Sequence, residues 1–298
     1  MPIDGWSKSS LKSLLDGCSW QWALQKLGGL DSPSGPHASA GTGLHAALEA
    51  HEQARIDGQP FTFEQGLQLA VTVGHQEGLQ VPAQWQRMHG DAQTAATWAG
   101  DMWCTWWESD VRQQLLTYTP LAVEWHFRIP VEGSDLPMRG FIDWVGRDAD
   151  GVLTVIDWKS ASNLRRWKNG DGQPLEAAAY LLGAAEWEPE GRRRIEWHVV
   201  SRKGEATVLV GPQVEGDTVD PRFVGAVIVA QEMLDSRSFE TNPSWNLCSD
   251  RWCPFYHGCQ VTGVLSPENI SFTENLPDDV LTPVSEGGPS YELADNED

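Results

Sequence analysis

The turn sequence Ala149–Asp150–Gly151, with an apolar segment on either side, is the feature that most constrains the fold of this 298-residue chain. A three-residue hairpin loop requires a left-handed residue at its last position, and Gly151 suits that position. This loop length fixes a register in which Asp143 lies opposite Asp157. The sequence therefore predicts two antiparallel strands with a pair of facing carboxylates.

Lys159 adds a third charged group to this pair. Directly opposed residues share one face of a sheet, with Cβ atoms about 5 Å apart, and Lys159 points the same way because it lies two residues after Asp157. The alternate positions are apolar and point to the opposite face, into the core: Ile142, Trp144, Ile156 and Trp158. Facing carboxylates are unfavourable unless a cation neutralises them, and Mg²⁺ or Mn²⁺ accepts oxygen ligands. The alternative is a surface salt bridge between two acids and one lysine.

Four of the five cysteines form a second group. Cys248, Cys253 and Cys259 lie close together near the C-terminus, and Cys18 lies far upstream. In a reducing compartment, clustered cysteines bind metal more often than they form disulfides. A site made from all four would tie the two ends of the chain together, and it could hold zinc or an iron–sulfur cluster. Cys104 has no near neighbour and is expected to be a small buried hydrophobe.

Composition sets further limits. The 40% hydrophobic content is typical of a soluble globular protein. No leader or apolar span is apparent, so we expect a cytoplasmic protein without membrane contact. The net charge of −21 opposes non-specific binding to nucleic acid. Residues 156–203, however, carry nine basic and seven acidic residues. This segment is either a local basic face or ordinary solvated surface.

The periodicity predicts helices first and strands afterwards. One helix is expected from Ser9 or Ser10 to Leu27, a second over residues 39–56, and further helical segments up to about residue 116. Three strands follow, and then a helix over residues 175–185, two strands, and a helix over residues 223–234. This order predicts an α/β or α+β core with a helical N-terminal part. The expected divisions are residues 1–118, 119–240, 241–265 with the cysteines, and an acidic tail, 266–298, that is expected to be disordered.

Three motifs in this order carry a family resemblance. The segments GFID, ending at Asp143, and IDWKS, with Asp157 and Lys159, resemble the signature of the PD-(D/E)XK nucleases. Upstream, GTGLHAALE, with His45, resembles a helix of RecB-like members. With its cysteines, the chain is similar to RecB-like exonucleases that carry an iron–sulfur cluster, a group with CRISPR-associated members and phage relatives. The resemblance extends from about Ser9 to Cys259.

This resemblance implies a restriction-endonuclease-like core, a central mixed sheet flanked by helices, and a metal site in it. His45, Asp143, Asp157 and the backbone carbonyl of Trp158 would bind catalytic Mg²⁺ or Mn²⁺. Asp143, Asp157 and Lys159 would be the catalytic residues.

The resemblance has implications for other residues as well. Family members usually carry Q-x-x-x-Y on the helix after the lysine. Here Glu176 and Tyr180 take the DNA-contacting positions, with Gln173 about one turn earlier. Glu124 lies where members often have a glutamate, and we assign it no role from the sequence. The iron–sulfur set would be a 4Fe–4S cluster that joins the ends of the chain, with these ligands: Cys18, Cys248, Cys253 and Cys259.

The implied activity is metal-dependent DNA exonuclease action on single strands or ends, in phage or bacterial recombination, repair or foreign-DNA processing. The alternatives are a non-catalytic DNA-binding scaffold that carries the cluster, and an endonuclease or prespacer-trimming factor. The chain has no G-x-x-x-x-G-K-[ST] motif, so a separate helicase or recombination partner could supply a motor. The oligomeric state is left open.

Overall fold

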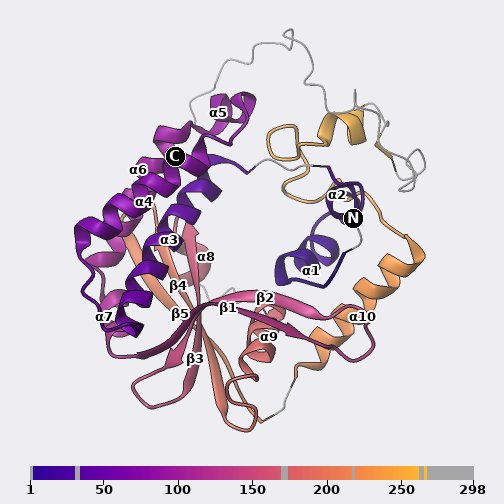
Figure 1. The fold of residues 1–298 in the computed structure, drawn as a ribbon. Helices are drawn as coiled ribbons and strands as arrows, with labels where there is room; N and C mark the ends of the chain where they lie inside the picture. Colours follow the sequence, from indigo (N-terminus) through magenta and orange to yellow (C-terminus); the bar gives the residue numbers. More distant parts are fainter. Residues whose placement is uncertain (1–2, 31–33, 169–173, 217–218, 262–264, 267–298) are drawn as a thin grey trace.

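The computed structural model describes residues 3–30, 34–168, 174–216, 219–261 and 265–266. A five-stranded sheet lies at the centre, with helices on both of its faces (Figure 1). The strands are β1 Thr119–Ile129, β2 Met138–Arg147, β3 Leu153–Ala161, β4 Arg192–Ser201 and β5 Glu205–Glu215. The helices are α1 Lys8–Leu15, α2 Ser19–Lys26, α3 Pro36–Ile56, α4 Phe63–Gly78, α5 Ala83–His89, α6 Ala92–Trp107, α7 Asp110–Leu116, α8 Arg165–Lys168, α9 Pro174–Ala184 and α10 Pro221–Ser236.

The sheet is mixed, as expected from the sequence. Its strands follow chain order, β1-β2-β3-β4-β5, and all neighbours are antiparallel except β3 and β4. Parallel neighbours require a crossover connection, and α8 and α9 lie in the segment between these two strands. The predicted mixed sheet flanked by helices, with a helical N-terminal part, is therefore confirmed.

The predicted hairpin between β2 and β3 forms in the predicted register. Trp144 pairs with Ile156, which is the register that sets Asp143 against Asp157. Gly151 has a φ of +79° and donates its N–H to the carbonyl of Asp148 at 3.0 Å. A glycine adopts this left-handed conformation without the steric cost that a Cβ would add.

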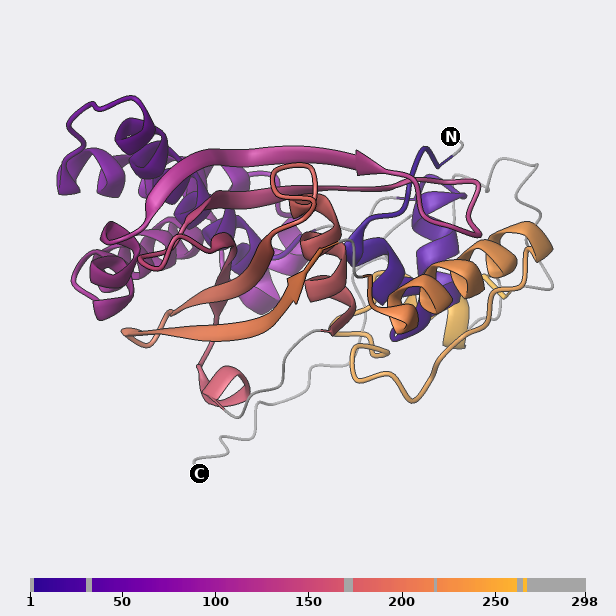
Figure 2. The ribbon, with the colours of Figure 1, turned by 90° about the horizontal axis from the view of Figure 1, so that it is seen from below.

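The two faces of the sheet pack into separate hydrophobic cores. One core includes Val145, Val155 and Trp197 and is completed by α1, α2, α9 and α10. The other includes Trp144 and Ile156 and is completed by α3, α4, α6 and α7. Figure 2 shows the sheet between the α3–α6 helices on one side and the α1, α2 and α10 group on the other. Buried tryptophans contribute much of both cores.

One expectation about the N-terminal part is wrong. The predicted single helix to Leu27 is two helices, α1 and α2, separated by Asp16, Gly17 and Cys18. Cys18 has an extended backbone, with φ −117° and ψ 106°, and its sulfur accepts a hydrogen bond from the N–H of Gln21 as the N-cap of α2. The apolar spacing is continuous through the break, which is why periodicity alone did not reveal it.

The cysteine-containing C-terminal segment contacts helices that are distant in the sequence. It ends in a π-helical turn, His257–Val261. The ring of Trp252 stacks on His89 of α5, with centroids 4.6 Å apart, and His89 lies within 3.3 Å of the carbonyl of Arg251. Figure 1 shows α5 and this segment facing each other at one end of the molecule. The predicted acidic tail lies outside the described residues, apart from Ser266. Across the described helices, none has the length and apolarity to span a bilayer.

A half-buried histidine at the start of α3 predicts a pH effect on stability. The ring of His37 stacks on Trp98 at 4.8 Å, and Arg202 approaches its Nδ1 at 2.6 Å. Burial, with the charges of Arg202, His89 and Arg251, lowers the pKa of His37 from 6.5 to about 4. Because the folded state favours the neutral ring, this contribution to stability is present above pH 6.5 and is lost as the pH falls towards 4.

We therefore expect the stability advantage of the wild type over the His37→Gln variant to shrink on acidification. Urea unfolding of both proteins at about pH 7.5 and about pH 5 measures this difference. Equal differences at the two pH values would show that His37 is not held neutral by its surroundings.

Candidate active site

The strands β2 and β3 separate where their carboxylates lie. Their ladder ends at the pair of Trp144 and Ile156, whose neighbours in the chain are the two aspartates. The N–H of Trp158 donates to Oδ2 of Asp143 at 2.7 Å. Asp157 and Lys159 remain in register with β4. This separation leaves the two carboxylates at a gap in the sheet and not within a continuous ladder.

A close approach of α3 brings His45 to this gap. A Cβ at Gly41 would lie 2.8 Å from Oγ of Ser160, and one at Gly43 would lie 2.5 Å from the carbonyl of Ala70 in α4. These two glycines of the GTGLH motif therefore allow α3 to pack tightly on β3 and α4. As a result, Nδ1 of His45 lies 3.7 Å from Oδ2 of Asp143.

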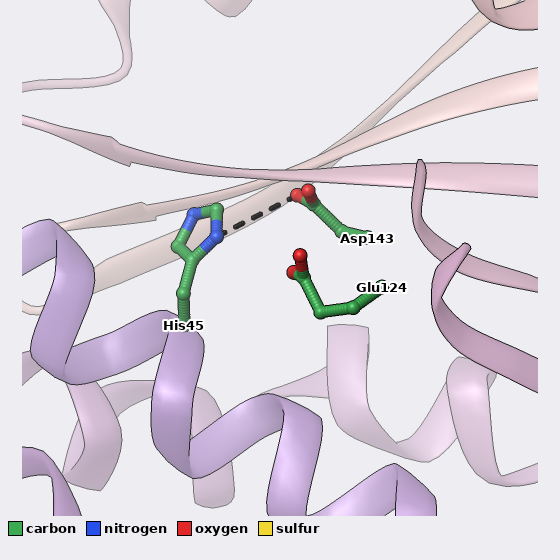
Figure 3. Close-up of side chains that lie close together, drawn as sticks. All are labelled: His45, Glu124 and Asp143. Atoms are coloured by element: carbon green, nitrogen blue, oxygen red, sulfur yellow. Dashed lines mark ion pairs between the residues drawn. The ribbon is translucent and has the colours of Figure 1, made fainter. Parts of the chain in front are cut away.

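Glu124 of β1 completes a three-residue group. His45, Glu124 and Asp143 each offer one ligand atom, and these atoms lie within 4.8 Å of one another. Figure 3 shows the histidine approaching from α3 and the two carboxylates turned towards it from the sheet. Glu124 has a φ of +48°, an unusual value for a residue other than glycine. Such strain is often found at functional sites.

The electrostatics of this group fit a bound cation. Burial raises the pKa of Asp143, as does the charge of Asp157, while His45 lowers it. Burial also raises the pKa of Glu124 to about 7, together with the charges of Asp143 and Glu49. Two crowded carboxylates and one imidazole favour a divalent ion that accepts oxygen and nitrogen ligands, such as Mg²⁺ or Mn²⁺. The residues present therefore fit a divalent metal.

Asp157 lies beside this group in a network of ion pairs. Its Oδ2 is 2.5 Å from Nζ of Lys159, and its Oδ1 is 2.6 Å from Nζ of Lys8. Both lysines also lie 2.9 Å from Oε1 of Glu176. Burial opposes the charge of Lys159, but Asp157 and Glu176 outweigh it and raise the pKa of Lys159 above its usual range. Lys159 is therefore held as an ammonium ion.

The residues predicted to contact DNA face the same carboxylate. Tyr180, one helical turn after Glu176 on α9, donates its hydroxyl hydrogen to Oδ1 of Asp157. Burial works against the charge of Glu176, but Lys159 and Lys8 lower its pKa. Both side chains are buried around Asp157. Gln173, the third polar position considered for this helix, lies outside the described residues.

The sequence interpretation did not include Lys8 and left Glu124 without a role. Lys8 begins α1, and its Nζ also lies 4.1 Å from the centre of the Tyr180 ring. No motif identifies a lysine 149 positions before its aspartate as a partner. The sequence placed Glu124 on the strand next to that of Asp143. This position predicts that the two residues are neighbours, but it does not predict that Glu124 binds a metal.

The position of Lys8 predicts a change in metal affinity. Its ammonium group neutralises Asp157 and so competes with any cation for that carboxylate. Replacing Lys8 with methionine should tighten Mn²⁺ binding by about fivefold, because a partly exposed ion pair is worth up to about 1 kcal/mol. Calorimetric titration with Mn²⁺ measures this change. Lys26→Met, at the exposed end of α2, is the matched control, and equal affinity in all three proteins would exclude competition by Lys8.

The four clustered cysteines line one small cavity between α2 and the C-terminal segment. All five cysteines of the chain are free thiols, and Cys104 on α6 does not line this cavity. Burial raises the pKa of Cys253 and of Cys259 to about 11, with a smaller contribution from neighbouring thiols. Thiols with such pKa values stay protonated at neutral pH unless a metal binds them. The donor set therefore fits a metal or cluster that takes four sulfur ligands.

Comparison with known proteins agrees with this geometry. A search of curated proteins finds no match. The family profile described as the PD-(D/E)XK nuclease superfamily matches residues 5–260, which include α1, the whole sheet and all four clustered cysteines. The chain therefore belongs to the PD-(D/E)XK nuclease superfamily, a group of metal-dependent enzymes that hydrolyse phosphodiester bonds in DNA.

Proposed function

We propose that this nuclease is a DNA exonuclease that acts on single strands or exposed ends, in phage or bacterial recombination, repair or foreign-DNA processing in the cytoplasm. The observation that carries the nuclease chemistry is the group of His45, Glu124 and Asp143 beside the Asp157–Lys159 ion pair. The exonuclease and single-strand parts are supported by the order of the GTGLH, GFID and IDWKS motifs and by the cysteine set.

His45, Asp143 and Asp157 would hold the metal, with Glu124 and the backbone carbonyl of Trp158 available beside them. A bound Mg²⁺ or Mn²⁺ would supply Lewis-acid stabilisation of the phosphate and lower the pKa of an attacking water. Glu124 reaches the site from β1. The N–H of Trp158 holds Asp143 in place at 2.7 Å.

Lys159 would stabilise negative charge electrostatically and would not act as a general base. Its raised pKa keeps the ammonium group protonated at neutral pH, so it cannot take a proton from water. A positioned ammonium group instead donates hydrogen bonds to negative charge that develops on the phosphate. Tyr180 and Glu176 orient this part of the site by contacting Asp157 and Lys159, respectively. DNA contact by these two residues is part of the proposal.

For the cysteine site we propose a 4Fe–4S cluster bound by Cys18, Cys248, Cys253 and Cys259. The four cysteines line one cavity, and four thiolates can hold either tetrahedral zinc or a cubane cluster. The resemblance of the motifs and cysteines to RecB-like exonucleases with an iron–sulfur cluster favours the cluster. Its role here is to join α2 to the C-terminal segment.

Cleavage assays on linear and circular single-stranded DNA test the function. With Mn²⁺ or Mg²⁺ we expect the linear strand to be shortened from an end and the circle to stay intact, and we expect EDTA to stop the reaction. Cleavage of the circle would identify an endonuclease instead. Binding without cleavage under every metal condition would identify a non-catalytic DNA-binding protein.

A further inference from the structure

A cavity of about 250 Å³ lies against the candidate active site. Its lining includes Lys8 and Ser9 of α1, Tyr180 of α9, and Arg139, Phe141 and Asp143 of β2. Asp143 belongs to the metal-binding group and Lys8 to the ion pairs around Asp157. The cavity therefore begins where the scissile phosphate would lie.

The pairing of β2 explains why a cavity forms here. On the edge of β2 away from β1, Trp6 forms a parallel bridge with Met138, and β3 begins to pair only at Trp144. Within the described residues, no strand pairs with that edge between these two points. Three lining residues occupy every second position of this stretch, so their side chains share one face at intervals of about 6.8 Å: Arg139, Phe141 and Asp143.

Phe141 offers an aromatic surface at this cavity. The side chain is 55% exposed, although large apolar side chains of this chain are mostly buried. His126, its partner across β1 and β2, lies against it with ring centroids 4.9 Å apart and planes tilted by 35°. A base can stack on such a ring whatever its identity, because every base has a π-face.

Two basic side chains lie near Phe141 on the same pair of strands, each two residues from Phe141 or from its partner His126. Arg139 pairs across the ladder with Arg128, and both bind Asp4. All three side chains are at least 41% exposed. Exposed ion pairs contribute little, so a phosphate can replace Asp4 at little cost. In a chain with a net charge of −21, these arginines are a local site for an anion.

We propose that this cavity binds one unpaired nucleotide of the substrate strand, next to the phosphate that is cleaved. The base stacks on Phe141, and the flanking phosphate contacts Arg139 and Lys8. Pockets that enclose drug-sized ligands measure about 300–1,000 Å³, so a cavity of 250 Å³ is of a size that suits a single base. The inference rests on the proposed nuclease function and specifies its substrate as a strand with an unpaired base at the active site.

Oligonucleotides with one abasic position test the stacking. Binding is measured by fluorescence anisotropy in EDTA, and the abasic position is moved along a single-stranded oligonucleotide. The proteins compared are the wild type, Phe141→Ala, Phe141→Trp and Val210→Ala. Val210 of β5 is the matched control, because it is an apolar strand residue with 56% exposure outside the cavity. When the abasic position falls at the cavity, we expect the wild type to bind the oligonucleotide at least about fivefold more weakly than the intact strand. This is the low end of the affinity loss expected when a base stacked on an aromatic ring is removed.

Phe141→Ala should bind the intact strand equally weakly and lose its sensitivity to that abasic position. Phe141→Trp and Val210→Ala should keep the sensitivity of the wild type to that abasic position. Full sensitivity in Phe141→Ala would overturn the nucleotide site, while DNA cleavage by the same preparation would leave the nuclease function standing. If the wild type neither binds nor cleaves DNA, the proposed function fails and the nucleotide site fails with it.

Discussion

The Lys159→Ala variant should lose DNA cleavage by about 10²–10³-fold, the usual cost of removing one donor that stabilises transition-state charge. The fold should remain intact, because Lys8 still neutralises Asp157 at 2.6 Å after the change. Initial rates of end-trimming on a labelled single strand, under single-turnover conditions with Mn²⁺, measure the loss. Circular dichroism and Mn²⁺ titration of the same sample separate a catalytic defect from a folding or metal-binding defect.

Lys203→Ala is the matched control, because this lysine is exposed in the turn between β4 and β5. Its rate should equal that of the wild type. A Lys159→Ala protein that cleaves at the wild-type rate would remove Lys159 from the reaction and, with it, the assignment of the IDWKS motif as catalytic.

The second large effect is expected from the cysteines. Cys253→Ser removes a proposed cluster ligand between α2 and the C-terminal segment. Loss of a structural metal site is among the few single changes that cost about 4 kcal/mol or more. We expect anaerobically purified wild type to be brown and to contain iron. The variant should be colourless, unfold at a lower temperature, and be cut by protease between residues 241 and 261.

Cys104→Ser tests the specificity of this effect. Cys104 lies on α6 and does not line the cavity of the other four cysteines, so the variant should keep both colour and iron. A colourless wild type that contains zinc would replace the cluster with a zinc site and leave the nuclease chemistry unchanged. A wild type without any bound metal, and as stable as Cys253→Ser, would refute a metal-bound cysteine site of either kind.

The sequence was most informative at the hairpin between β2 and β3, where the conformation required of one loop residue determined the pairing of the strands. Gly151 fixed the length of the hairpin loop and, with it, the register of β2 and β3, so Asp143 and Asp157 could be placed opposite each other although both faces of these strands are buried. A shift by one residue would have moved every side chain to the other face. The motif with His45 similarly gave a helix that reaches the same gap in the sheet.

Other features depended on tertiary contacts that local patterns do not encode. Lys8 reaches Asp157 only because α1 packs beside α9, and Glu124 becomes a candidate ligand through a left-handed backbone conformation within β1. The break between α1 and α2 also escaped prediction, because Cys18 caps the second helix while the apolar spacing runs on. The contact of Lys8 and the group with Glu124 join segments that are distant in the sequence, so no local pattern reports them, whereas the break at Cys18 is a local feature that periodicity alone does not register.

Anomalous diffraction from a crystal soaked in Mn²⁺ tests most directly whether the gap between β2 and β3 holds the metal used for DNA cleavage. We expect one strong manganese peak within bonding distance of His45 and Asp143, with Glu124 or Asp157 as a further ligand and Lys8 displaced from Asp157. A fully soaked crystal without manganese at this position, or with its only strong peak elsewhere on the chain, would contradict the metal site.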